Sequence, residues 1–199
     1  SSFRLASIHA EVHLSTIDLA FPTLSTARLT LRAIRPVDAA PFHALMSIAD
    51  TTRYSNWPDG PSLEDVVKSV ERMSAMFSAG TGCGWIVEDR HTTDFMGAIR
   101  LNWIDREWKR GGIGYELHPA YWRQGLATEA LRAVAACGHD IFDLNRLEAW
   151  TMPGNGASDR VLEKAGFRFE GIRRQNAWFT GAFHDFRSFA RLRSDTLEG

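Results

Sequence analysis

The sequence predicts a single layered domain of the α/β (α+β) class. A chain of 199 residues is long enough for one domain, and 44% hydrophobic with 24% charged residues is typical of a soluble globular protein. Alternating and helical apolar patterns follow one another in the order β α α β β β α β α β β. This order contains few βαβ units, so we do not expect a long doubly wound parallel sheet.

The first part of the domain is expected to contain one strand and two helices. Alternating apolar residues predict a strand at residues 29–33, and Pro36 opens a helix whose apolar residues recur at helical spacing up to Ala49. Residues 51–61 are expected to form a loop. In residues 62–77, a capping serine, two acidic residues and a helical apolar stripe predict the second helix.

The second part carries most of the sheet. Glycines at 80–84 break the chain before three strands, which are expected at residues 85–87, 95–104 and 109–117. The remaining elements are a helix at 125–142, a strand at 146–152, a helix at 155–165 that stops at Gly166, and strands near 167–179 and 183–192.

We expect three parts along the chain. Residues 1–25 show no clean periodicity and form an N-terminal extension, which either packs against the domain or stays loose. Residues 26–193 form the domain, and residues 194–199 form a C-terminal tail.

Composition narrows the classes of partner. Lys and Arg number 23 against 24 Asp and Glu, which excludes a strongly basic protein held on nucleic acid or anionic lipid by its bulk charge. Cys83 and Cys137 form no metal-ligand or redox motif. No apolar run approaches the ~18 residues that span a bilayer, and the N-terminal segment leaves no room for a signal-peptide core. We therefore expect a cytoplasmic protein with no direct contact to nucleic acid or membrane.

Two further groups of residues carry weaker signals. His9 and His13 lie four residues apart but lack an identifiable third ligand, so no metal site is expected. Trp85, Trp103 and Trp150 lie in predicted strands, so we expect them in the core.

The most informative stretch is a strand, a short loop and a helix within residues 115–130. Backbone N–H groups at the start of a helix are unpaired, and the helix dipole favours an anion there. Gly125 and Ala127 keep side chains away from these groups, and Arg123 adds a positive charge. A phosphate could therefore approach the main chain closely. The alternative is that Gly125 only eases a tight turn from strand to helix.

A set of motifs carries a family resemblance. In chain order they are residues 26–32 (TARLTLR), 114–117 (GYEL), 121–130 (YWRQGLATEA), 145–149 (NRLEA), 155–158 (NGAS), 162–167 (LEKAGF), 170–171 (EG) and 181–185 (GAFHD). The ordered set resembles the GNAT acyltransferase superfamily and, within it, the branch that acetylates the N-terminal alanine or serine of ribosomal proteins. The resemblance implies transfer of acetyl from acetyl-CoA to a primary amine. It also implies a mixed, mostly antiparallel sheet that is splayed at its middle and flanked by about four helices.

The resemblance assigns residues to the coenzyme, whose pantetheine arm would lie in the split of the sheet. Backbone N–H groups of the loop and helix start would hold the pyrophosphate, and the end of the splayed strand would pair with the pantetheine. The residues expected at the coenzyme are Leu117, His118, Arg123, Gln124, Gly125, Leu126, Ala127, Thr128 and Asn155. Asn155 could instead be only a helix cap. Trp122 stands where superfamily members often carry Gln or Arg, so one polar contact to the coenzyme is lost.

Two residues are candidates for acid and base chemistry. By resemblance, Ser158 would lie near the sulfur and could protonate the leaving thiolate, although it could also be only a first-turn residue. Glu116 ends the strand that should line the split, and we expect it to be the general base or a water-relay partner. The alternative for Glu116 is an exposed carboxylate paired with a neighbouring arginine. Some members of the branch carry a glutamate base just before the final hairpin, where this chain has Ala177.

The acceptor must lose a proton before it attacks. Deprotonating a lysine amine of pKa ~10.4 at pH 7 costs about 4.6 kcal/mol, whereas an α-amine of pKa ~7.7–8.0 costs about 1–1.4 kcal/mol. A site without a strong base therefore favours an α-amine.

The loop at residues 51–58 is expected to form the wall of the acceptor site. Tyr54 and Trp57 could hold a peptide or a small amine through their aromatic surfaces, or could only anchor a packed loop. The expected function is N-terminal acetylation of a ribosomal or other protein, by direct attack in a ternary complex. The alternatives are a small amine acceptor (an amino acid, a polyamine or an antibiotic) and a CoA-binding regulatory module without turnover. The chain is expected to act as a monomer or a homodimer.

Overall fold

The structure of the protein is a computed structural model that describes residues 20–57 and 60–196. Eight strands form one sheet in the order β1-β2-β3-β4-β5-β6-β8-β7. The strands are β1 (Leu24–Ser25), β2 (Leu29–Ala33), β3 (Cys83–Asp89), β4 (Phe95–Asp105), β5 (Arg110–Leu117), β6 (Arg146–Thr151), β7 (Arg168–Phe179) and β8 (Ala182–Leu192). The helices are α1 (Ala39–Met46), α2 (Ala49–Thr52), α3 (Leu63–Ala75), α4 (Leu126–Asp140) and α5 (Gly156–Lys164), with short 3-10 turns at Pro36–Asp38 and Pro119–Tyr121. The predicted α/β (α+β) class and mostly antiparallel sheet are confirmed.

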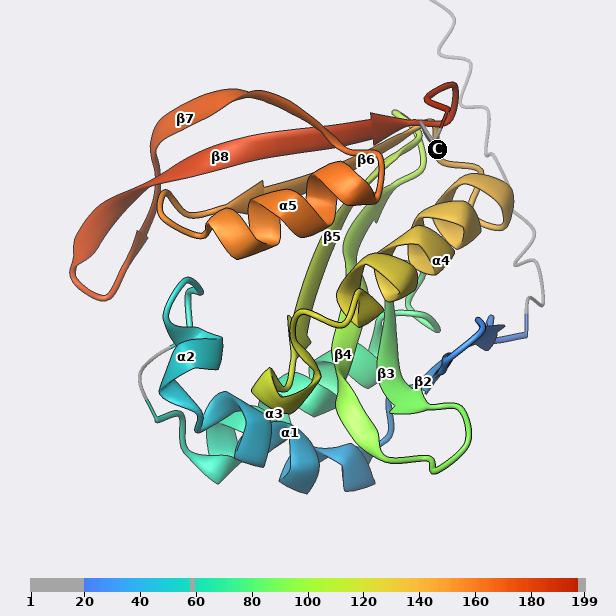
Figure 1. The fold of residues 1–199 in the computed structure, drawn as a ribbon, viewed down its shortest axis with the longest axis vertical. Helices are drawn as coiled ribbons and strands as arrows, with labels where there is room; N and C mark the ends of the chain where they lie inside the picture. Colours follow the sequence, from blue (N-terminus) through green and yellow to red (C-terminus); the bar gives the residue numbers. More distant parts are fainter. Residues whose placement is uncertain (1–19, 58–59, 197–199) are drawn as a thin grey trace, which may run out of the picture.

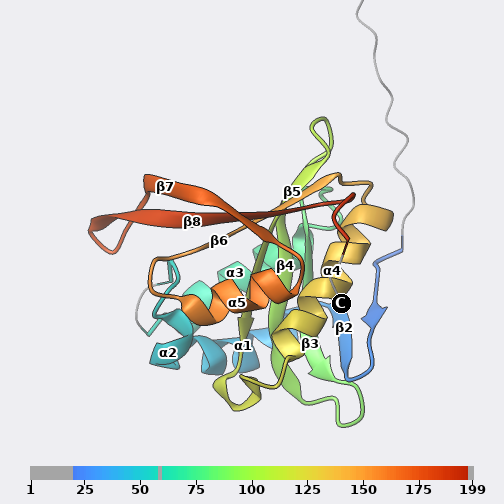
Figure 2. The same cartoon turned by 45° about the horizontal axis from the view of Figure 1, so that its top comes forward.

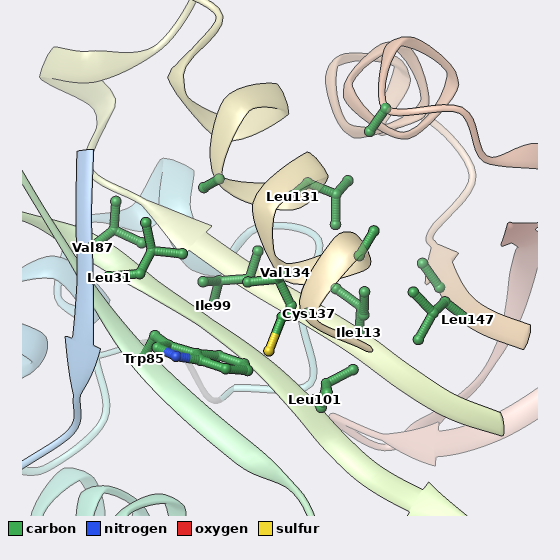
Figure 3. Packing of buried hydrophobic residues seen from close by; sticks show 14 of the residues in the cluster. Leu31, Trp85, Val87, Ile99, Leu101, Ile113, Leu131, Val134, Cys137 and Leu147 are labelled. Carbon is green, nitrogen blue, oxygen red and sulfur yellow. The ribbon is translucent and has the colours of Figure 1, made fainter. Parts of the chain in front are cut away.

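The first half of the sheet is covered by helices on both faces (Figure 1). Alternation along β3 sends Trp85 and Val87 into the core beneath α4, and sends Ile86 into the core beneath α1 and α3. Figure 3 shows Leu131, Val134 and Cys137 of α4 packed over this face of the sheet. The first five residues of β3 (CGWIV) therefore form a continuous buried run, because both faces of this strand are covered.

The sheet divides between β5 and β6. These strands are parallel and pair over three residues, where 110–112 lie beside 146–148. Beyond that point β5 continues along β4, while β6 turns away with β8 and β7, as Figure 1 and Figure 2 show. The helices α4 and α5 lie on the same side of the two diverging halves. The splayed sheet expected from the resemblance is confirmed.

The first helix differs from the prediction. A single helix was expected from Pro36 to Ala49, but α1 ends at Met46 and a separate short helix, α2, occupies the start of the predicted loop. The side chain of Ser47 donates to the carbonyl of His43 (2.8 Å), and Ile48 is extended. A serine side chain that bonds back to the preceding turn weakens and bends a helix, and the helix ends where Ile48 leaves helical geometry.

The chain segment just before β2 is part of the folded structure. Leu24 and Ser25 form β1 and pair with β2, although residues 1–25 were expected to form an extension. Phe21 packs against the core, and the carbonyl of Pro22 accepts from the buried indole N–H of Trp85 (2.7 Å). These contacts come from residues 20–25, the part of the expected extension that the structure describes, and the three-part division of the chain stays a prediction.

Two of the three strand tryptophans are not core residues. Trp85 is fully buried, as expected, but Trp103 and Trp150 are 38% and 40% exposed. Trp150 stacks on Phe186 at 3.9 Å, and Trp103 covers Gly112. The prediction was wrong for these two because, among the described residues, the buried cluster that contains α1 and α3 ends at Ala98 on β4 and includes no residue of β6.

Candidate active site

Backbone groups of β5 point into the split. His118 N–H donates to the carbonyl of Met96 (2.8 Å), and in an antiparallel pair such bonded positions alternate. Glu116 and Gly114 therefore carry the bonds to β4, and the N–H and C=O groups of Tyr115 and Leu117 point the other way. The carbonyl of Leu117 accepts from the indole N–H of Trp122 (2.6 Å). The other groups at this end of β5 are the donors and acceptors that an added extended chain would need.

A second set of backbone donors lies at the start of α4. Its first helical bond runs from Glu129 N–H to the carbonyl of Gly125 (3.0 Å), so the N–H groups of Leu126, Ala127 and Thr128 precede the ladder. Gly125 is the N-cap, with φ +77°, and has no side chain that could occupy these donors. Arg123 is also left-handed, at φ +60°, which turns the chain sharply before the helix. The loop therefore presents free N–H groups at the positive end of a 15-residue helix.

The one carboxylate in the first turn of α4 is neutralised. Glu129 accepts from the hydroxyl of Thr26 (2.6 Å) and pairs with the guanidinium of Arg28 (2.7 Å). Partial burial raises the pKa of the Glu129 carboxyl, but these hydrogen bonds outweigh burial and lower the pKa overall. An anion at the helix start is therefore not opposed by this charge.

An open groove lies beside the start of α4. Its walls include Gly125 and Thr128, the paired side chains of Arg28 and Glu129, and the cationic side chains of Arg132 and Lys164. Arg132 donates to the carbonyl of Lys164 at 2.6 and 3.2 Å, which fixes its guanidinium without cancelling its charge. The groove therefore suits an anionic group.

The side chain of His118 makes its contacts within the protein. Its Nδ1 accepts from Ala120 N–H (3.1 Å) and caps the short turn after β5, and its ring packs edge-on against Tyr121. The amide of Gln124 donates to the carbonyl of Ala120 (2.9 Å). These bonds shape the loop that leads to α4.

Glu116 is paired with an arginine. Both of its carboxylate oxygens accept from Arg100 of β4, at 2.5 and 2.8 Å, and Arg100 also donates to Asn102 (3.0 Å). The two charged side chains are only 10% and 11% exposed. Burial lowers the pKa of the Arg100 guanidinium, but the charge and hydrogen bonds of Glu116 raise it overall. The pairing that we considered as the alternative for Glu116 is present, although the pair is buried rather than exposed.

Ser158 and Asn155 meet at the start of α5. The Asn155 Oδ1 accepts from Ser158 N–H (3.2 Å), so Asn155 is a helix cap, the alternative that the sequence left open. Ser158 Oγ lies 2.7 Å from the hydroxyl of Tyr115 across the split. Tyr115 is not among the site residues expected from the sequence, because its alternation with Ile113 and Leu117 is also typical of a core position.

The expected acceptor wall divides into two roles. Trp57 packs edge-on against Phe42 at 6.1 Å and joins the core beneath α1 and α3, so it anchors the loop. Tyr54 is half-buried, and its ring lies 3.5 Å from the position that a Cβ on Gly154 would take. Tyr54 therefore connects the α2–α3 loop to the segment that leads into α5.

The described residues give little support to a metal site, a cysteine nucleophile or a membrane-spanning helix. Among residues 20–57 and 60–196, no group of three or more His, Cys, Asp or Glu side chains could hold a metal, and His9 and His13 lie outside the described residues. Burial raises the pKa of the Cys83 thiol and raises that of Cys137 to about 12. Neither thiol is therefore an available nucleophile. None of the described helices has the length and apolar character to cross a membrane.

Comparison with known proteins assigns the family. The profile of the acetyltransferase (GNAT) domain matches residues 28–168. An uncharacterized N-acetyltransferase of Bacillus subtilis, YoaA, is 34% identical over 165 residues, which are 83% of this chain and 93% of that protein.

Two solved structures share the fold. One is RimL, a ribosomal L7/L12 α-N-protein acetyltransferase in complex with coenzyme A (TM-score 0.76, 24% identity, 84% of this chain and 95% of that chain). The other is a spermidine N-acetyltransferase from Vibrio cholerae in complex with CoA and spermine (TM-score 0.74, 18% identity, 85% and 98%). The chain therefore belongs to the GNAT acetyltransferase family and is an acyltransferase that uses acetyl-CoA.

Proposed function

We propose that this protein transfers acetyl from acetyl-CoA to the α-amine at the N-terminus of a protein, by direct attack in a ternary complex. The observation that carries the proposal is the split of the sheet. There the outward backbone groups of β5 lie next to the free N–H groups at the start of α4. A thioester bound there would supply an activated acetyl group to an amine that enters the same split.

Two groups of residues would hold the coenzyme. Backbone N–H groups from Arg123 to Thr128 would hold the pyrophosphate, and the open groove with Arg28, Arg132 and Lys164 would take further anionic groups. Leu117 and its neighbours would pair with the pantetheine arm. Asn155 would contact it through Nδ2, because Oδ1 is already used as the helix cap.

The α-amine is favoured because the site has little basic power. Glu116, the proposed proton acceptor or water-relay partner, has both oxygens engaged by Arg100, and Ala177 has no carboxylate at all. At pH 7, deprotonating an α-amine costs only about 1–1.4 kcal/mol, whereas deprotonating a lysine amine costs about 4.6 kcal/mol. A carboxylate engaged in this way can therefore remove a proton far more easily from an α-amine. Ser158 would donate a hydrogen bond to the leaving thiolate.

Tyr54 would form part of the acceptor wall, and Trp57 would hold the loop that carries it.

A small amine is the second candidate acceptor, because a spermidine acetyltransferase has a similar fold. We infer that the enzyme acts as a monomer or homodimer in the cytoplasm.

The test is a panel of matched acceptors. Release of CoA would be measured with one peptide in three forms: a free α-amine with blocked lysines, a blocked α-amine with free lysines, and both blocked. Spermidine and free amino acids complete the panel. We expect release with the first peptide and a mass increase of one acetyl group on its N-terminal residue. Faster release with the lysine peptide or with spermidine would overturn the α-amine proposal. Tight acetyl-CoA binding with no release from any acceptor would instead indicate a regulatory module.

A further inference from the structure

The hydroxyl groups of Tyr115 and Ser158 are in contact across the split. Their oxygens lie 2.7 Å apart, with Tyr115 on β5 and Ser158 in the first turn of α5. Both ends are fixed by the backbone: β5 pairs with β4 at Ile99–Tyr115, and Ser158 N–H donates to Asn155. The contact joins two residues 43 positions apart and connects the two halves of the sheet where the strands have separated.

The chemistry of the two hydroxyls favours one direction for this hydrogen bond. A phenol is a stronger acid than an aliphatic alcohol, so the phenolic O–H is the better donor and the serine oxygen the better acceptor. Among the described residues, neither hydroxyl makes any other hydrogen bond. When Tyr115 donates, Ser158 keeps its own O–H hydrogen free for a further acceptor.

Tyr115 itself is a poor source of protons. Burial raises its pKa to about 12, and the hydrogen bond to Ser158 lowers the pKa by less than burial raises it. The other charged groups that act on it are Asp159 and Glu116, and both raise the pKa. A leaving thiolate, whose thiol has a pKa of ~8.5, would take a proton from such a phenol with an equilibrium constant on the order of 10⁻³ to 10⁻⁴. Tyr115 therefore stays neutral and acts as a fixed hydrogen-bond donor.

We propose that Tyr115 is a positioning residue for acyl transfer, because its hydroxyl holds Ser158 Oγ so that the serine O–H points to the departing sulfur. This inference rests on the proposed function, in which Ser158 lies near the thioester sulfur. The C–N bond forms as the C–S bond breaks, and the bonding electron pair leaves on sulfur. The proton released by the attacking amine goes to Glu116 or solvent, and solvent returns one proton to the thiolate. Tyr115 and Ser158 donate hydrogen bonds and lose no proton.

The first test needs no acceptor and uses CoA itself as the probe. The thiol pKa of bound CoA would be measured from the ultraviolet absorbance of its thiolate, in the wild-type protein and in Tyr115→Phe and Ser158→Ala. We expect the thiol pKa of bound CoA to be lower than that of free CoA in the wild type. In either variant this pKa should rise by about one unit, which corresponds to the loss of one hydrogen bond to a charged group. Tyr121→Phe removes the hydroxyl of a nearby tyrosine and is the control.

An equal thiol pKa in the wild type and both variants would overturn the inference, even if the protein proves to be an active acetyltransferase. Failure to bind CoA at all would overturn the proposed function as well.

The second test separates positioning from a merely structural effect. With the best acceptor of the panel, Tyr115→Phe is expected to lower kcat about tenfold while the KM for acetyl-CoA changes less than twofold. In the Ser158→Ala background the same change should lower kcat by less than twofold, because the hydroxyl that Tyr115 positions is gone. A tenfold loss in both backgrounds, or a loss confined to KM, would contradict the proposed role.

Discussion

Arg100 and Glu116 show how a single side-chain pair changes the meaning of a candidate residue. A carboxylate near the end of β5 is well placed for base chemistry, yet two short bonds commit it to a buried guanidinium. Removing one partner of a buried pair leaves an uncompensated buried charge. The free-energy cost of that charge is larger than the net stabilisation that the intact pair provides. Glu116 therefore has a structural task whether or not it also accepts a proton.

The pair predicts a large loss of stability in Glu116→Gln. We expect the free energy of unfolding to fall by about 3–5 kcal/mol, because Arg100 would stay buried without a counter-charge. Urea denaturation measures the loss. Glu64→Gln, in an exposed pair with Lys68, is the control and should cost less than about 0.5 kcal/mol. A loss below 1 kcal/mol for Glu116→Gln would mean that the carboxylate is not held by Arg100, and this result would favour the role of a base.

At the scale of elements, the start of α4 depends on one glycine. Gly125 caps the helix at φ +77°, where an L side chain is strained, although a Cβ would meet nothing closer than Arg28 at 3.6 Å. The constraint on this position is therefore conformational rather than steric. Relief of the strain would rotate the N–H groups that follow.

Gly125→Ala is expected to weaken acetyl-CoA binding about tenfold or more. Isothermal titration with CoA measures the effect. Gly181→Ala provides a matched control, because Gly181 has φ +76°, has open space around it, and lies in the β7–β8 turn away from α4. Both variants should lose about 1–2 kcal/mol of stability from the left-handed backbone. Equal CoA affinity in the two variants would contradict a role for the α4 donors.

The end of α4 carries a pH-dependent element. His139 is 5% exposed, its Nδ1 contacts the carbonyl of Leu144 (2.9 Å), and its Nε2 has no partner among the described residues. Burial lowers the pKa of its imidazole. The Leu144 contact opposes this effect, and the charges of Arg191 and Arg193 add to it.

His139 therefore predicts a loss of stability in acid. Its folded pKa lies below the unfolded value of ~6.5, so the unfolded chain binds the proton more readily as the pH falls. The contribution is complete above pH ~6.5 and decreases from there down to the folded pKa. We expect the stability difference between the wild type and His139→Gln to shrink between pH 7.5 and 5, as measured by urea unfolding. A constant difference over that range would show that His139 does not titrate differently on folding.

The local patterns predicted most elements but not the contacts between them. Apolar runs and alternation located the strands from β2 to β8, and the serine cap located the start of α3, because these signals come from neighbouring residues. The break after Met46 coincides with a serine bond and an extended Ile48, which the apolar spacing does not reveal. The pairs Arg100–Glu116 and Tyr115–Ser158 depend on strand pairing and on the split, so no local pattern could predict them.

At the scale of the whole molecule, the sheet has two halves with different support. The half from β2 to β5 has one core under α4 and a second core against α1 and α3 that includes residues of β3 and β4, whereas the half with β6, β8 and β7 has its core on the face toward α5. The split lies at their junction, so the site is formed by a wall with helices on both faces on one side and a less covered wall on the other. The exposed aromatic residues of the second half are Trp150, Phe169, Trp178 and Phe183.

The outer edge of the first half depends on residues 20–25, which predicts different behaviour for two truncated chains. Removal of residues 1–25 would take away β1, Phe21 and the Pro22 carbonyl, and would leave the fully buried Trp85 indole N–H without its acceptor. An unsatisfied buried donor alone costs about 1–3 kcal/mol, and the lost apolar contacts add to this.

We expect the chain lacking residues 1–25 to be less stable by about 3 kcal/mol or more than the chain lacking residues 1–19. Urea unfolding of the two truncated chains measures residues 20–25 alone, because both lack everything before them. Phe21→Ala in the full chain should reproduce part of the loss, since the ring packs edge-on to Phe77 at 5.2 Å. Equal unfolding midpoints for the two truncated chains would mean that the domain begins after Ser25. A lower midpoint for the shorter chain would instead place the start of the domain at or before Phe21, with β1 as the edge strand that completes the core under α4.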